Sequence, residues 1–206
     1  MNKFSSTCAL PIVAARGQSS RFAVSGNAVL KTVVTGKRYA IPDGKSVIIG
    51  ASFVRDQTDT QIRRCEHEQN RTGLNTLIPT IDIDPEALSG FCAIRATTPD
   101  RFPVVGPMPQ LSGYPENYAR LSDGLPGHRF PNASYYKGLY VISGFGSRGI
   151  VSTPYCANLL ADYLLGSADQ NRKNSDEDSE ILSSWSAQLH PGRFKVRDLR
   201  RTRGLI

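Results

Sequence analysis

Apolar and β-branched residues come in short runs over the first quarter of the chain, separated by glycine, proline and small polar residues. Such runs, broken by residues that favour tight turns, are typical of consecutive strands. We predict strands at residues 12–14, 20–24, 28–35, 37–41 and 45–53. Because strands joined by short turns run in opposite directions, the simplest arrangement is an antiparallel sheet.

Two longer segments carry apolar residues at helical spacing. Residues 60–78 are weakly amphipathic up to Pro79, whereas residues 149–165 have a stronger apolar face. That face consists of Ile150, Val151, Tyr155, Ala157, Leu160, Ala161 and Leu164. Elsewhere we expect a short capped turn or helix at 82–88, strands at 90–97 and 138–143, an extended stretch at 99–109, loops with one helical turn at 110–137 and a short helix at 180–189.

Composition places the chain among globular proteins. Of its 206 residues 39% are hydrophobic and 21% charged, and no apolar run approaches the roughly 18 residues that would span a bilayer. The four cysteines are widely spaced and form no C-x-x-C motif, so neither a zinc site nor a disulfide framework is indicated. We therefore expect no membrane association, no metal and a reducing, cytoplasmic location.

Positive charge gathers at the C-terminal end. Residues 189–206 contribute +5 of the formal net charge of +7: Arg193, Lys195, Arg197, Arg200, Arg201 and Arg203 stand against Asp198 alone. A basic segment of this kind contacts nucleic-acid phosphates, or it is a solvated end that favours solubility. The charge pattern by itself leaves both interpretations open.

A glycine-rich loop lies between a predicted strand and a predicted helix. Gly144-x-Gly146-x-x-Gly149 has the spacing of a dinucleotide-binding fingerprint, but only 57 residues follow Gly149 and no later strand ends in an acidic residue. A complete mononucleotide-binding unit therefore does not fit after it. Glycines still allow close approach of a flat ligand, and the first amides of the helix favour negative charge such as that of a reduced flavin. The alternative is a turn whose glycines serve packing only.

Four segments, in order along the chain, resemble one known group of proteins. They are Arg16-Gly17-Gln18 with Ile49–Phe53 and Glu68–Arg71, then Ile94–Gly106, then Gly138–Pro154, and more weakly Leu189–Arg197. Together they resemble the FAD-dependent oxidoreductase domain of tRNA wobble-uridine modification enzymes, within the D-amino-acid-oxidase-like family. The resemblance implies an α+β fold, in which an antiparallel substrate-side sheet accompanies the C-terminal strand, loop and helix of a FAD/NAD(P)-binding domain.

The resemblance also implies a reaction. Enzymes of this group oxidise the C–N bond of 5-carboxymethylaminomethyl-(2-thio)uridine at the tRNA wobble position with FAD, and hydrolysis then gives 5-aminomethyl-(2-thio)uridine and glyoxylate. One alternative is a fragment of a glycine- or sarcosine-oxidase-like enzyme acting on small amines. Another is a non-catalytic RNA-binding remnant, since the family's N-terminal Rossmann unit has no counterpart in this sequence.

Site residues follow from the resemblance position by position. The loop residues Gly144, Phe145, Gly146, Ser147, Arg148 and Gly149 are expected to contact FAD, with a solvated Arg148 as the alternative. Arg95 is expected to act in catalysis and to bind a substrate carboxylate, for which a guanidinium is suited; a structural pair with an acid such as Asp100 is its alternative. Asp100 and Arg101 are expected near the flavin ring or the substrate, or they form a turn ion pair. For His67, His128 and His190 we expect no role as ligand or base.

The same resemblance implies partners and a division of the chain. tRNA is expected to contact Arg193, Lys195, Arg197, Arg200 and Arg201, and a separate N-terminal Rossmann or methyltransferase polypeptide is a possible protein partner. We divide the chain into a substrate-side part (1–98), a flavin-facing part (99–166) and a polar linker with a basic tail (167–206).

Overall fold

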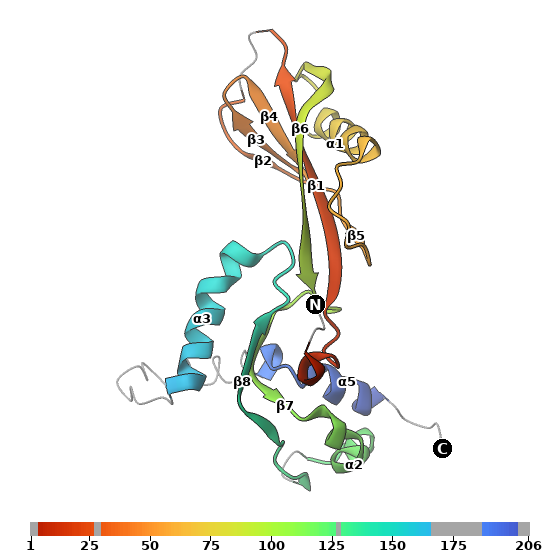
Figure 1. Ribbon diagram of the computed structural model, residues 1–206, viewed down its shortest axis with the longest axis vertical. Coiled ribbons are helices and arrows are strands. Elements are labelled where there is room, and N and C mark those ends of the chain that lie inside the picture. Colours follow the sequence, from red (N-terminus) through yellow and green to blue (C-terminus); the bar gives the residue numbers. More distant parts are fainter. Residues whose placement is uncertain (1–3, 27–29, 127–128, 166–186, 202–206) are drawn as a thin grey trace. The chain divides into compact units, whose positions relative to one another are not determined.

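The computed structural model describes residues 4–26, 30–126, 129–165 and 187–201 (Figure 1). It contains two compact units, one formed by Val13–Arg95 and the other by the segments before and after that range. The three-part division predicted from the sequence stays a proposal. Its polar linker falls largely on residues outside the described ranges.

The unit formed by Val13–Arg95 is built on a six-stranded sheet with the order β2-β3-β4-β1-β5, in which β6 also pairs with β1. The pairs β1–β4, β1–β5, β2–β3 and β3–β4 are antiparallel, as the short turns predict. The strands are β1 (Val13–Val24), β2 (Val34–Thr35), β3 (Tyr39–Asp43), β4 (Ser46–Gly50), β5 (Val54–Arg55) and β6 (Ile83–Thr97).

Three predictions within this unit are wrong. Of the strand predicted at 28–35, only Val34–Thr35 is a strand among the described residues 30–35. The strands predicted at 12–14 and 20–24 form one continuous strand, β1, because its first half pairs with β5 and its second half with β4. The helical turn predicted at 82–88 is the beginning of β6. The local signal for that turn is real, since the Asp84 carboxylate accepts a hydrogen bond from the Glu86 amide at 2.9 Å, but the backbone continues as a strand.

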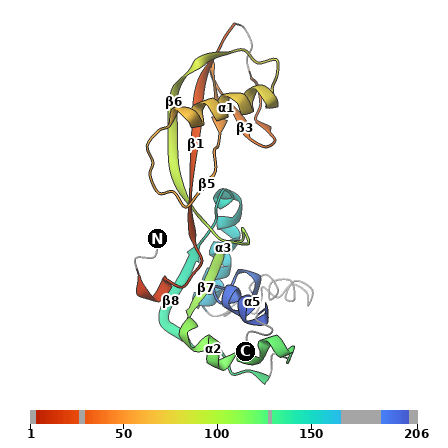
Figure 2. The ribbon, with the colours of Figure 1, turned by 90° about the vertical axis from the view of Figure 1, so that its right-hand side faces the viewer.

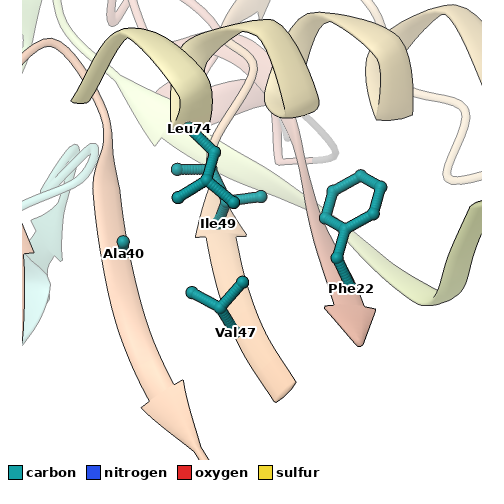
Figure 3. Packing of buried hydrophobic residues seen from close by; sticks show 5 residues of the cluster. All are labelled: Phe22, Ala40, Val47, Ile49 and Leu74. Carbon is teal, nitrogen blue, oxygen red and sulfur yellow. The ribbon is translucent and has the colours of Figure 1, made fainter. Parts of the chain in front are cut away.

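A single helix, α1 (Arg64–Leu77), lies against one face of this sheet (Figure 2). Leu74 on α1 meets Phe22, Ala40, Val47 and Ile49, which project from β1, β3 and β4 (Figure 3). Because all of them are at most 1% exposed, each contributes roughly 1–3 kcal/mol of burial free energy, with alanine at the low end. The helix predicted at 60–78 is thus confirmed.

The second unit contains a two-stranded antiparallel sheet of β7 (Val104–Pro109) and β8 (Tyr135–Ser143). The helix α3 (Gly149–Leu165) packs on β7, and Val105, Cys156, Leu159 and Leu189 form the core between them. Short turns complete the unit: η1 (Ser5–Thr7), η2 (Leu111–Gly113), α2 (Tyr114–Asn117) and η3 (Ala119–Asp123).

The apolar face predicted for α3 matches only in part the face that packs. Cys156, Leu159 and Leu160 point toward the core, whereas Ile150 and Val151 are 95% and 84% exposed. The helix is apolar on two sides, so the spacing of its apolar residues does not by itself separate the packed side, which includes the predicted Leu160, from the exposed one. No helix in the described part of the chain is both long and apolar enough to cross a membrane.

The segment predicted as a basic tail contains a helix, α5, which spans Arg193–Arg201. Of the short helix predicted at 180–189, residues 187–189 are described and helical, and the others lie outside the described residues.

Candidate functional site

The guanidinium of Arg95 lies over a glycine on the sheet of the Val13–Arg95 unit. A Cβ atom placed on Gly17 of β1 would lie 2.6 Å from Arg95 Cζ, so only glycine leaves room for this side chain. Within the described residues, the buried Nη1 of Arg95 has no hydrogen-bond partner. A buried guanidinium nitrogen without a partner is costly unless a ligand supplies the acceptor.

A second polar group, Tyr39, lies over another glycine on the same face of the sheet. Its ring covers Gly50 of β4, where an added Cβ would overlap the phenol. The register that pairs Ser20 with Ile49 brings Gly50 beside Ser19, two residues along β1 from Gly17. The two glycines therefore lie roughly 8 Å apart, judged from standard strand spacing. Sequence reasoning missed Tyr39, because its place over Gly50 depends on the register of β3 against β4.

The opposite face of the sheet holds this arrangement rigid. Arg16 is fully buried and donates to Glu66 Oε1 at 2.8 Å, to Gln18 Oε1 at 3.1 Å and to the Gln61 carbonyl at 2.8 Å. Ser52 donates to the other Glu66 oxygen. Satisfied buried networks of this kind fix the backbone around them, here the part of β1 that contains Gly17.

The glycine loop of the second unit follows β8 directly. Gly144 and Gly146 have positive φ values of 79° and 57°, which favour glycine. The loop is closed onto the end of β6: Gly146 donates its N–H to the Ala96 carbonyl at 2.8 Å, and Phe145 pairs with Thr97 in a β-bridge. A Cβ on Gly144 would lie 2.7 Å from the Thr98 methyl, so only glycine lets the loop backbone lie this close to Thr98.

The predicted cofactor-binding residues lie at different depths of this loop. Gly144 is buried and Phe145 packs its ring against the core of the second unit. Ser147 and Arg148 are exposed, and Gly149 begins α3, whose first-turn amides have no partner within the helix. The loop and the helix start thus offer backbone donors and one cation to an anionic, flat group, which fits the flavin end of FAD.

The structure places Asp100 with the C-terminal helix. Arg193 forms a two-pronged pair with its carboxylate, at 2.9 and 3.0 Å, and also donates to the Phe102 carbonyl at 2.9 Å. Burial by itself raises the pKa of Asp100, but the pair with Arg193 outweighs it and lowers that pKa below its usual 3.8. Arg197 is farther away, at 3.7 Å. Arg101 is exposed in a left-handed turn with φ of 65°.

Two of the three histidines, His190 and His67, make hydrogen bonds within the described residues. His190 accepts a hydrogen bond from the Gly192 amide on Nδ1 at 3.0 Å, while Nε2 lies 3.3 Å from the Tyr135 hydroxyl. Burial, helped by the charge of Arg193, lowers the pKa of His190 to about 4. His67 is hydrogen-bonded to Ser20 at 2.7 Å, on the α1 side of the sheet. His128 lies outside the described residues.

The comparison with protein families defines the class. A family model described as FAD dependent oxidoreductase (DAO) matches residues 2–163, so this chain belongs to the FAD dependent oxidoreductase family. FAD is the cofactor of that family, and the fold class predicted from the sequence is confirmed.

Relatives within the family carry one particular name. The chain is 32% identical over 216 residues to the "tRNA 5-methylaminomethyl-2-thiouridine biosynthesis bifunctional protein MnmC" of Pseudomonas savastanoi pv. phaseolicola, an alignment covering 99% of this chain and 31% of that protein. It is 31% identical over 218 residues to the MnmC protein of Chromohalobacter salexigens, covering 98% of this chain and 30% of the relative. The chain spans less than a third of the length of these relatives.

Solved structures show the fold alone. Glycine oxidase from Geobacillus kaustophilus is similar with a TM-score of 0.55 at 20% identity, over 76% of this chain and 36% of that one. L-Proline dehydrogenase from P. horikoshii is similar with a TM-score of 0.57 at 14% identity, over 90% of this chain and 41% of that one.

Proposed function

We propose that the chain is the substrate-side and flavin-covering part of an oxidase that acts on 5-carboxymethylaminomethyl-(2-thio)uridine at the tRNA wobble position and gives 5-aminomethyl-(2-thio)uridine. One observation carries the proposal: Arg95, with an unpaired buried Nη1, and Tyr39 lie over glycines on one face of the sheet. A guanidinium and a phenol hydroxyl that lie over glycines suit the binding of a carboxylate attached to a flat, uncharged group. The carboxymethylamino group carries such a carboxylate.

In this account, Arg95 holds the substrate carboxylate in two-pronged geometry and Tyr39 donates its hydroxyl to the same group. Gly144, Gly146, Ser147, Arg148 and Gly149 would hold FAD, with Phe145 fixing the loop to the core. FAD held there would supply the oxidant, a hydride acceptor for the methylene next to the carboxylate. The amine nitrogen loses its proton, the resulting imine takes up water, and the C–N bond breaks to release glyoxylate and the primary amine.

The proposed partners follow from the relatives and from the exposed surface. The MnmC proteins are named for tRNA modification, and the basic helix α5 supplies cations for tRNA phosphates. The exposed Ile150 and Val151, directly after the glycine loop, suit contact with a dinucleotide-binding segment, on this polypeptide or a separate one. Modification of tRNA and four free cysteines are consistent with a cytoplasmic location.

The test measures glyoxylate release from tRNA bearing the modified uridine, with FAD and a dinucleotide-binding segment supplied from a curated relative. We expect turnover by the wild-type chain, and for Arg95→Lys a KM increase of roughly tenfold, because the ammonium loses the two-pronged contact. Release of glyoxylate from free glycine or sarcosine, with the tRNA inert, would replace this function by a small-amine oxidase. Absence of turnover on both, with tRNA still bound, would indicate a non-catalytic RNA-binding protein.

A further inference from the structure

The helix α5 carries its arginines on one face. At 100° per residue, Arg193, Arg197, Arg200 and Arg201 fall within an arc of roughly 100°, whereas Lys195 lies on the opposite side. Lys195 instead lines a separate cavity of about 500 Å³ together with Ser5, Met108 and Asp198. The five cations that the sequence groups as one tRNA-contacting set therefore belong to two surfaces.

The arginine face lines an open groove of about 600 Å³. None of the residues lining it is acidic; they are Ala187, Gln188, His190, Gly192, Arg193, Val196, Arg197, Arg200 and Arg201. Arg200 and Arg201 are exposed. The Nε of Arg197 is buried and, in the described part of the chain, has no hydrogen-bond partner, so it is a donor that a bound anion can engage.

One arginine of the face has a different task. Arg193 is only 12% exposed. Its guanidinium donates hydrogen bonds to Asp100, to the Phe102 carbonyl and, at 3.0 Å, to the Leu189 carbonyl. It also stacks on the buried Phe194 ring at 4.1 Å. These contacts fasten α5 to the turn before β7, and in the same turn Thr98 donates to the Phe102 carbonyl at 2.7 Å. Thr97, one residue earlier, bridges to the glycine loop.

We propose that the groove formed by Arg197, Arg200 and Arg201 binds the phosphate backbone of RNA, while Arg193 and Asp100 anchor it to the turn that supports the glycine loop. This deepens the proposed function and rests on it, since the RNA is the tRNA substrate. The groove belongs to the same compact unit as the loop. Phosphates bound in the groove are thus held at a fixed distance from the glycine loop. This would position one nucleotide of a large substrate at that loop.

The experiment measures the dissociation constant of the 206-residue chain for a tRNA transcript with a wobble uridine, by fluorescence anisotropy over a range of KCl concentrations. The test variant is Arg200→Gln/Arg201→Gln. The charge-matched control is Lys31→Gln/Lys45→Gln, which removes two exposed cations from the other unit. The face control is Lys195→Gln.

We expect the arginine variant to bind tRNA about tenfold more weakly at roughly 100 mM KCl and to lower the slope of log Kd against log [KCl] by about 1.5, since two phosphate contacts are lost. Both control variants should stay within about twofold of wild type. Equal losses of tRNA affinity in all three variants, or no loss in the arginine variant, would overturn the assignment of the groove as the phosphate-binding surface, while tRNA would remain a partner. No tRNA binding by the wild-type chain would overturn both the groove and the tRNA substrate, whereas flavin-dependent turnover of small amines would remain testable.

Discussion

At the scale of single residues, two glycines decide which side chains lie over one face of the sheet. Gly17 and Gly50 each leave the space that a polar side chain occupies, Arg95 over the first and Tyr39 over the second. The motif around Arg95 points to this residue from the sequence alone. Tyr39 cannot be found that way, because its place depends on the register of β3 against β4, which brings Tyr39 opposite Gly50.

A first prediction concerns the glycine beneath Arg95. In Gly17→Ala the added methyl would overlap the guanidinium, so Arg95 has to leave its position. We expect KM for the carboxylate-bearing substrate to rise roughly tenfold, with a smaller change in kcat, because binding is lost more than chemistry. Steady-state kinetics of the reconstituted oxidase measures both. Gly113→Ala, where the nearest atom is a side-chain amide at 3.4 Å, is the matched control, and an equal KM effect there would contradict the account.

A second prediction concerns the half-buried His190. Its pKa is about 4 in the folded protein and 6.5 ordinarily, so the unfolded chain binds the proton first as the pH falls. The contribution of neutral His190 to the free energy of unfolding is therefore fully present above pH 6.5. It decreases as the pH falls from 6.5 to 4, by up to about 3 kcal/mol. Urea unfolding at a series of pH values measures this slope, and His190→Gln should flatten it. A slope unchanged in the variant would show that another group is responsible.

At the scale of elements, the pair of Asp100 and Arg193 decides the place of α5. Asp100→Asn leaves a mostly buried guanidinium without its counter-charge, and we expect a loss of about 2–3 kcal/mol in the free energy of unfolding. Asp123→Asn is the control: its partner Arg120 is 72% exposed, so the loss should stay below about 0.5 kcal/mol. Equal losses in urea unfolding would mean that α5 is not held by this pair.

The elements also show how far sequence patterns reach. α1, α3 and β8 are predicted as elements of the right type, because each carries apolar residues and has a glycine or proline near one end, although the packed face of α3 is predicted only in part. β1 is predicted as two strands, since its pairing changes from β5 to β4 midway and Gly17 resembles a break. The basic end is predicted as a tail, because its fold depends on Asp100, 93 residues earlier in the chain.

At the scale of the whole molecule, Ile150 and Val151 are exposed at the start of α3, and the proposed function assigns them to contact with a dinucleotide-binding segment. Ile150→Asp/Val151→Asp should hardly change the stability of the chain, since acidic residues suit the first turn of a helix. It should weaken binding of the dinucleotide-binding segment of a curated relative more than tenfold, because a buried apolar contact is replaced by charge. Isothermal titration calorimetry measures this affinity. Ala157→Asp/Asn158→Asp, also exposed on α3, is the control that should retain binding.

The most direct test of the central claim is anaerobic reduction of flavin by substrate. The chain is combined with FAD and the dinucleotide-binding segment of a relative, and tRNA bearing 5-carboxymethylaminomethyl-(2-thio)uridine is added while the visible flavin absorbance is followed. The account predicts bleaching by this tRNA with wild type, and slower bleaching with Arg95→Lys. Absorbance that stays constant with the modified tRNA, while free glycine or sarcosine bleaches the flavin, would contradict it.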